Sequence, residues 1–227
     1  MPTFGGKNGG NASELSTWDS PANIPATVLP GAADRVIANR SFVVDQNYTW
    51  RSCQVSAPFD YRIVVNQGVT MTITDNAQIE GEITSEGTVV FNGRLFVGAN
   101  MQLNGIGTYR LSACQATIDR PVQLGNVIIE AASLVTISEN VTVDSLTNGI
   151  GCVTILRTGA AIRSTLPIEN AGTIRVMCDH ADDRVVITGG VNVNAVQVIQ
   201  GGVNTSGNPV VNAPGGGGLG GGGGIAG

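Results

Sequence analysis

Residues 69–74 read Val69-Thr70-Met71-Thr72-Ile73-Thr74 and alternate apolar with polar side chains without a fault. Because successive side chains of a β-strand point to opposite sides, this pattern places the valine, the methionine and the isoleucine on one face. Residues 173–178, Thr-Ile-Arg-Val-Met-Cys, alternate in the same way. β-Branched residues, which favour strands, are common from residue 35 to about residue 200, and no convincing helical stripe interrupts them. The pattern predicts an all-β body.

Glycines punctuate the predicted strands and limit them to about four to six residues. Many follow Glu or Asn, as in Asn92-Gly93 and Asn104-Gly105, and such pairs permit positive φ and mark tight turns. Asn-Gly pairs suit the hairpins of an antiparallel β-sandwich or jelly roll. An irregular repeat of short strands separated by small turns suits a β-solenoid, or β-helix, in which strands of successive coils stack in parallel. We predict the solenoid, with the sandwich or jelly roll as the alternative.

The composition divides the chain into three regions. Residues 1–34 contain several glycines and prolines and are predicted to form an extended anchoring arm with little regular structure. Residues 35–200 form the β-rich body, and residues 201–227 form a Gly-rich tail. Aromatic and proline side chains on an extended arm concentrate binding energy. The candidate residues for anchoring a partner are therefore Phe4, Trp18, Pro21, Pro25 and Pro30.

The Gly-rich tail has two possible structural interpretations. Residues 215–227 contain only Leu219, Ile225 and Ala226 besides glycine, which is typical of a flexible linker. Glycine also allows chains to pack very closely, so three copies of the tail could form a packed bundle. The sequence leaves both readings open.

Charge and hydropathy exclude two classes of partner. The net charge is −5, and a single lysine, Lys7, accompanies eleven arginines without forming a basic stripe. Binding to a nucleic-acid backbone needs such a stripe, so we expect no nucleic-acid partner. No apolar run is long enough for a membrane span, and residues 1–10 lack the apolar segment of a signal peptide. We therefore expect no membrane insertion and synthesis in a cytoplasm.

The residues that commonly carry catalysis or bind metals are scattered. The four cysteines match no zinc spacing and are predicted to be buried free thiols: Cys53, Cys114, Cys152 and Cys178. The only histidine, His180, lies in an acidic segment with Asp179, Asp182 and Asp183, where we predict a solvated loop rather than a metal site. Glu80 and Glu82 would share one face of a strand, as a pair for glycoside hydrolysis or as a charged sheet edge. We predict no enzyme activity, no cofactor and no metal.

One segment, which spans part of the predicted arm and the first predicted strands, carries a resemblance to a known class of proteins. The segment contains Thr17-Trp18, then Leu29-Pro30-Gly31-Ala32-Ala33-Asp34-Arg35-Val36-Ile37, then Phe42-Val43-Val44-Asp45. It resembles the start of β-helical fibre, spike and decoration proteins of bacteriophage particles, some of which also have a Gly-rich end. The resemblance implies a non-enzymatic virion protein that forms a homotrimer, docks by its N-terminal arm on tail, portal or capsid proteins, and meets a host glycan or protein. The alternatives are a bacterial surface adhesin and a polysaccharide-degrading tailspike.

Overall fold

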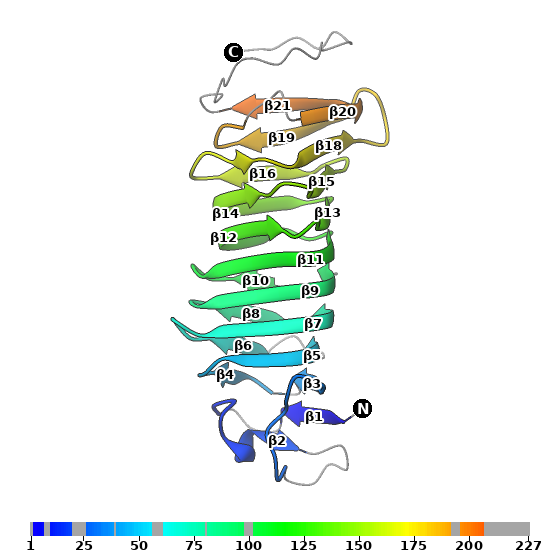
Figure 1. The fold of residues 1–227 in the computed structure, drawn as a ribbon. Helices are drawn as coiled ribbons and strands as arrows, with labels where there is room; N and C mark the ends of the chain where they lie inside the picture. The colour runs from blue at the N-terminus through cyan, green and yellow to red at the C-terminus, as the bar shows by residue number, and fades with distance from the viewer. Residues whose placement is uncertain are drawn as a thin grey trace.

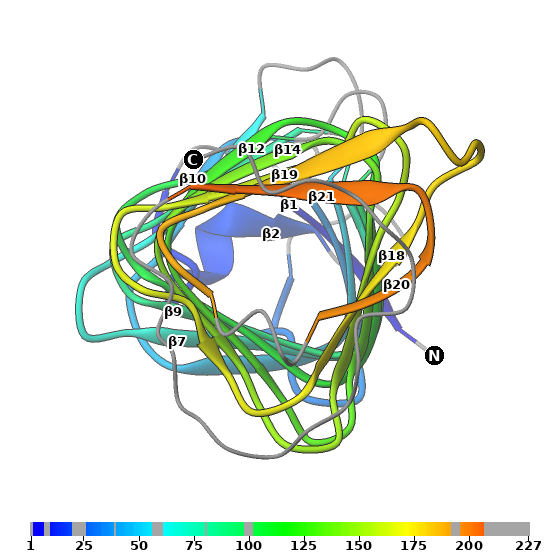
Figure 2. The same ribbon diagram turned by 90° about the horizontal axis from the view of Figure 1, so that it is seen from above.

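The chain folds as a three-sided β-solenoid of about eight turns (Figures 1 and 2). The computed structural model describes residues 2–6, 10–19, 26–38, 40–55, 61–79, 81–97, 102–191 and 196–206. Almost all strand pairs are parallel, and each strand pairs with its counterpart in the next coil, so the predicted solenoid is confirmed and the antiparallel sandwich is not formed. Coils differ in length: Val36 pairs with Cys53, 17 residues later, and Cys53 pairs with Ala77, 24 residues later.

Each coil contributes strands to three faces, which we call A, B and C. Face A contains the C-terminal halves of β5 (Tyr48–Val55), β7 (Thr70–Ile79), β9 (Thr88–Val97) and β11 (Thr108–Ile118), together with β1 (Thr3–Gly6), β3 (Arg35–Ala38), β13 (Leu134–Ile137), β15 (Val153–Leu156), β18 (Thr173–Met177) and β20 (Val196–Gln200). Face B contains the N-terminal halves of β5, β7, β9 and β11, the C-terminal halves of β12 (Val122–Glu130) and β14 (Asn140–Asn148), and β17 (Glu169–Asn170). Face C contains β4 (Phe42–Val44), β6 (Arg62–Val65), β8 (Glu82–Ser85), β10 (Gln102–Asn104), the N-terminal halves of β12 and β14, β16 (Ala161–Ser164), β19 (Arg184–Thr188) and β21 (Gly202–Ser206).

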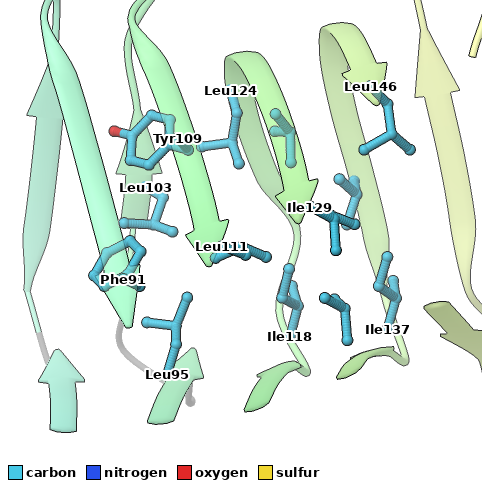
Figure 3. A pocket seen from close by; sticks show the side chains of 13 residues that line it. Phe91, Leu95, Leu103, Tyr109, Leu111, Ile118, Leu124, Ile129, Ile137 and Leu146 are labelled. Carbon is cyan, nitrogen blue, oxygen red and sulfur yellow. The ribbon is translucent and has the colours of Figure 1, made fainter. Parts of the chain in front are cut away.

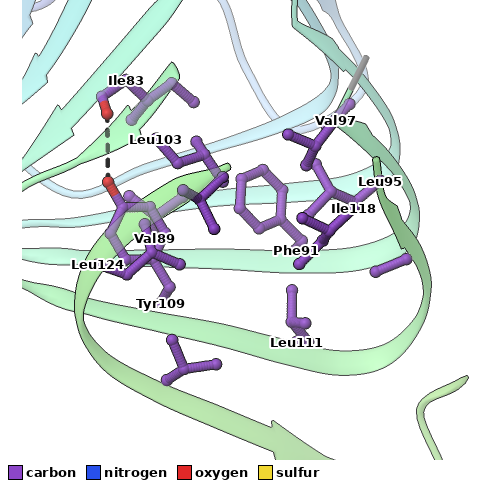
Figure 4. Packing of buried hydrophobic residues seen from close by; sticks show 14 of the residues in the cluster. Ile83, Val89, Phe91, Leu95, Val97, Leu103, Tyr109, Leu111, Ile118 and Leu124 are labelled. Carbon is purple, nitrogen blue, oxygen red and sulfur yellow. Dashed lines mark hydrogen bonds between the residues drawn. The ribbon is translucent and has the colours of Figure 1, made fainter. Parts of the chain in front are cut away.

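The core consists of inward-facing side chains that stack in columns from coil to coil (Figure 4). Met71 and Ile73 point inward, as their alternation predicts, and Ile174 and Val176 do the same. On face A the inward column runs through Phe4, Val36, Cys53, Ala77, Leu95, Ala116, Val135, Thr154 and Ile174. Since each inward residue is covered by its neighbours in the adjacent coils, burial of apolar surface holds the stack together.

Glycines form corners between the faces, not hairpins. Gly93 lies within β9 with φ 106°, and Gly105 lies between β10 and β11 with φ 110°. The corner that contains Gly105 also stacks Gly87, Gly107 and Gly125, where added Cβ atoms would meet backbone atoms of the preceding coil at 2.3 to 2.4 Å. The Asn-Gly signal therefore predicts a turn correctly but not the parallel continuation of the chain after it.

The N-terminal end of the solenoid is closed by the chain itself. β1 pairs in parallel with β3, and β2 (Trp18–Asp19), which follows the 3-10 turn η1 (Leu15–Thr17), pairs antiparallel with β1. The Trp18 ring is fully buried, and its centroid lies 4.9 Å from that of Phe42 and 5.9 Å from that of Trp50. Its Nε1 donates to the carbonyl oxygen of Ala12 at 2.9 Å, as does the Tyr48 hydroxyl at 3.0 Å. The described part of the predicted arm is thus a cap that packs on the body.

Face C has one break in its ladder. β4, β6, β8 and β10 form a separate four-stranded sheet, and the pairing resumes with β12 and β14. An apolar cavity of ≈ 30 Å³ lies beside the break, between Leu103 of β10 and Leu124 of β12 (Figure 3). Its apolar lining offers a water molecule no hydrogen-bond partners, and its volume is far below that of a ligand pocket. The cavity is a packing defect and not a binding site.

The C-terminal coil is less well covered. β20 pairs with β18 and β21 with β19, and no other described strand follows them. Val198 and Ile199 are 44% and 63% exposed. The predicted boundary at residue 200 falls between β20 and β21, and most of the Gly-rich tail lies outside the described residues. Within the described part of the chain, no helix has the length and apolar character needed to cross a membrane.

Candidate functional site

The predicted anchoring residues lie in different places. Phe4 and Trp18 are 4% and 0% exposed, and Pro30 is also buried. These side chains pack within the N-terminal cap and could meet a partner only after the cap had opened. Pro21 and Pro25 lie outside the described residues. The geometry therefore gives Phe4 and Trp18 a structural role inside this chain, and their contact with a partner stays a prediction.

Glu82 lies on the outer surface of face C with three hydrogen-bond donors around its carboxylate. Arg62 donates from Nε at 2.8 Å, Thr84 from its hydroxyl at 2.8 Å and Asn104 from Nδ2 at 3.0 Å. Burial by itself raises the pKa of Glu82, but these hydrogen bonds outweigh it and hold the pKa below its ordinary value. A general acid for glycoside cleavage needs a raised pKa, so this environment does not suit Glu82 to that task. Glu80 lies outside the described residues.

His180 lies in a turn that is held together by Asp183. The Asp183 carboxylate accepts from the backbone N–H of His180 and from the Thr158 hydroxyl, each at 3.0 Å. Residues 179–182 are exposed, and no group of three or more His, Cys, Asp or Glu side chains in the described residues could hold a metal ion. The exposed loop predicted here is confirmed, and the absence of a metal stays a prediction.

All four cysteines are free and buried, as predicted. Burial raises the pKa of Cys53 to about 12 and that of Cys114 to about 11. Because the thiolate is the reactive form, these thiols act as small apolar side chains and not as nucleophiles.

The outer surface of face A differs from the rest of the molecule in its charge. Its outward side chains, in chain order, are those of Thr3, Arg35, Ile37, Ser52, Gln54, Asn76, Gln78, Arg94, Phe96, Gln115, Thr117, Leu134, Thr136, Val153, Ile155, Thr173, Arg175, Met177, Gln197 and Gln200. This set contains three arginines and no carboxylate. On faces B and C, Arg110 pairs with Glu130 and Arg62 pairs with Glu82, both at 2.8 Å, whereas Arg163 of face C has no described partner. At the edge of face A, next to Ser52 and Asn76, Arg51 pairs with Asp75 at 3.4 Å.

Arg94 and Phe96 form the centre of this surface. Both are exposed, Phe96 to 51%, and they alternate on β9 with the buried Leu95 and Val97. The other aromatic side chains that the structure describes are buried or half-buried, including Trp18 and Trp50. Arg94 makes no hydrogen bond or ion pair with any other described residue.

Polar side chains flank Arg94 and Phe96 in the adjacent coils. Asn76 and Gln78 are their register partners on β7, and Gln115 and Thr117 are their partners on β11. Neighbouring coils are separated by about 4.8 Å, so the six side chains form a patch two residues wide and three coils high. In the run 94–97 only Arg94 is polar, so the one sequence signal for an outward Phe96 is that it lies two residues after Arg94. Its neighbours could not be predicted, because they depend on the register between coils.

A scan against protein-family models, a search of curated proteins and a search of solved structures each found no match to the chain.

Proposed function

We propose that this chain is a non-enzymatic structural and adhesive protein of a bacteriophage particle, a fibre, spike or decoration protein. The observation that carries the proposal is the uninterrupted stack of parallel coils along face A, from β1 to β20. About eight coils at about 4.8 Å each make a body roughly 40 Å long, in which each coil packs against the adjacent coils. Such a body suits a stiff spacer that holds a surface away from a particle.

The difference between the two ends supports assembly with other chains through the C-terminal end. The N-terminal end is closed by the Trp18 cap, whereas the last described coil exposes Val198 and Ile199, and its outer strand edges pair with no other described strand. Exposed edges and apolar side chains favour association with a further chain. A homotrimer that closes around the C-terminal end is the arrangement we propose, with attachment to other virion proteins.

The native mass is the first test of the assembly. Light scattering during size-exclusion chromatography separates a 23.3 kDa monomer from a trimer, and a trimer is the expected result. A Val198→Asp/Ile199→Asp variant, altered only in the exposed part of the last coil, is expected to be monomeric with unchanged β-structure by circular dichroism. A wild-type monomer would contradict the trimer.

The location is tested separately by mass spectrometry of purified phage particles from cultures of the source. Detection of the chain at a fixed copy number per particle is the expected result. Its absence from particles, with labelling of the bacterial surface by an antibody, would replace the proposal with a bacterial adhesin. Deletion of residues 1–30 is a poor probe of docking, because it removes β1 and Trp18 and so opens the cap.

A further inference from the structure

We propose that the outer surface of face A, centred on Arg94 and Phe96, binds an acidic polysaccharide. The inference rests on the proposed adhesive function and names the class of ligand and the residues that recognise it. The ligand is a polymer of sugars that carry carboxylates, in which one sugar ring covers Phe96 and a neighbouring carboxylate meets Arg94.

The spacing of the two central side chains fits such a ligand. Arg94 and Phe96 are two residues apart on one strand, so their Cβ atoms are separated by about 7 Å. The flat face of a sugar ring presents C–H groups, which pack on the exposed phenyl ring and remove apolar surface from water. A guanidinium accepts a carboxylate in a bidentate pair, and Arg94 has no described partner that competes for it.

The flanking side chains supply the hydrogen bonds that sugar hydroxyls require. Asn76 and Gln78 on one side and Gln115 on the other are exposed, and Thr117 is half-buried. Amides and hydroxyls both donate and accept, as sugar hydroxyls do. The parallel stack repeats this arrangement at about 4.8 Å, which presents an extended ligand with several polar groups in succession.

The charge of the surface selects an anionic ligand. Arg35 and Arg175 lie on the same face and donate to the neutral amides of Gln54 and Gln197, so no carboxylate on this face neutralises them. A chain of net charge −5 thus carries three arginines on this face, Arg35, Arg94 and Arg175, that form no ion pair with a described carboxylate. The charges are few and are interleaved with Phe96 and neutral amides, which favours an acidic glycan over the phosphate backbone of a nucleic acid.

Binding is tested with polygalacturonate as the acidic glycan and its fully methyl-esterified form as the matched neutral control. In affinity electrophoresis the intact chain is expected to be retarded by the acid and not by the ester. Arg94→Gln and Phe96→Ala are each expected to weaken binding about tenfold, as the loss of a charge-assisted hydrogen bond or of a stacked ring implies. Arg163→Gln, which removes an exposed arginine from face C, is the control and is expected to bind as wild type does.

Several outcomes would overturn the inference. These are equal retardation by the ester, a loss with Arg163→Gln as large as with Arg94→Gln, and no effect of Phe96→Ala. Equal binding of a double-stranded DNA fragment would show a general affinity for polyanions and would also overturn it. Presence of the chain in phage particles is measured independently. A chain that is in particles but does not bind polygalacturonate refutes this inference and leaves the proposed function standing.

Discussion

Replacement of Gly107 by alanine should destabilise the solenoid through a clash between coils. An added Cβ would lie 2.3 Å from the carbonyl oxygen of Gly87 in the preceding coil, whereas real Cβ atoms keep at least 3.0 Å. The carbonyl must therefore retreat by about 0.7 Å. The same oxygen accepts from the backbone N–H of Thr108 at 2.8 Å, so the retreat stretches that bond to about 3.5 Å, the limit of a hydrogen bond.

The expected cost combines these two effects. A buried backbone group that loses its partner costs about 1–3 kcal/mol, and overpacking adds about 1–3 kcal/mol. We expect a loss of about 3–4 kcal/mol, which for a chain of this size lowers Tm by roughly 10 °C. Thermal unfolding followed by circular dichroism measures it.

Gly151→Ala is the matched control, because it makes the same chemical change where no atom lies within 4 Å. Gly151 has φ 77°, but Ala132 occupies the equivalent corner of the preceding coil with φ 57°. The left-handed conformation costs about 1–2 kcal/mol, partly offset by lower entropy of the unfolded chain. We expect Gly151→Ala to stay within about 1 kcal/mol of wild type. Equal Tm values for the two variants would refute the reasoning from coil-to-coil contact.

Three further predictions concern the cap, the thiols and Glu82. Trp18→Ala should cost about 3–5 kcal/mol in denaturant unfolding, because it empties the centre of the cap; a change below about 1 kcal/mol would show that the cap contributes little. In the native protein Cys53 and Cys114 should resist a thiol reagent at mildly alkaline pH and react once the chain is unfolded, since burial raises the pKa of both; rapid native labelling of either would contradict their burial. The pKa of Glu82 is lower in the folded than in the unfolded state, so its contribution to stability is present above its ordinary value of 4.5 and is lost as pH falls through the folded pKa. The stability difference between wild type and Glu82→Gln should accordingly shrink in acid, and a difference that does not change with pH would rule this out.

Alternation allowed much of the core to be predicted from the sequence. Met71, Ile73, Ile174 and Val176 are buried as their pattern requires. The alternation predicts burial correctly because a period of two is a property of the single strand and does not depend on which strand pairs with it. The solenoid was also predicted, from short strands and a repeat that drifts.

The pairing of coils and the role of the N-terminal region could not be predicted in the same way. The parallel ladders join residues from 17 positions apart, as in Val36 and Cys53, to 32 positions apart, as in Phe4 and Val36, and periodicity alone does not set that register. Trp18 lies in a segment rich in glycine and proline where no alternation marks an inward side. Its burial depends on Phe42 and Trp50, which are distant in sequence, so an arm with exposed aromatic residues was the natural prediction.

Within one strand of the solenoid, the inward side chains stabilise the fold, and the outward side chains are free to contact other molecules. The outer surface of face A therefore carries information about ligands that the core does not. Leu95 and Val97 point into the core, and corner glycines such as Gly93 set the path of the chain. The fold does not require an arginine at position 94 or an aromatic residue at position 96, because both side chains point to water. Folding alone therefore does not account for an exposed aromatic ring beside an arginine without a described partner. A ligand that binds both side chains would account for the two together, and the Phe96→Ala and Arg94→Gln variants separate the two contributions without disturbing the core.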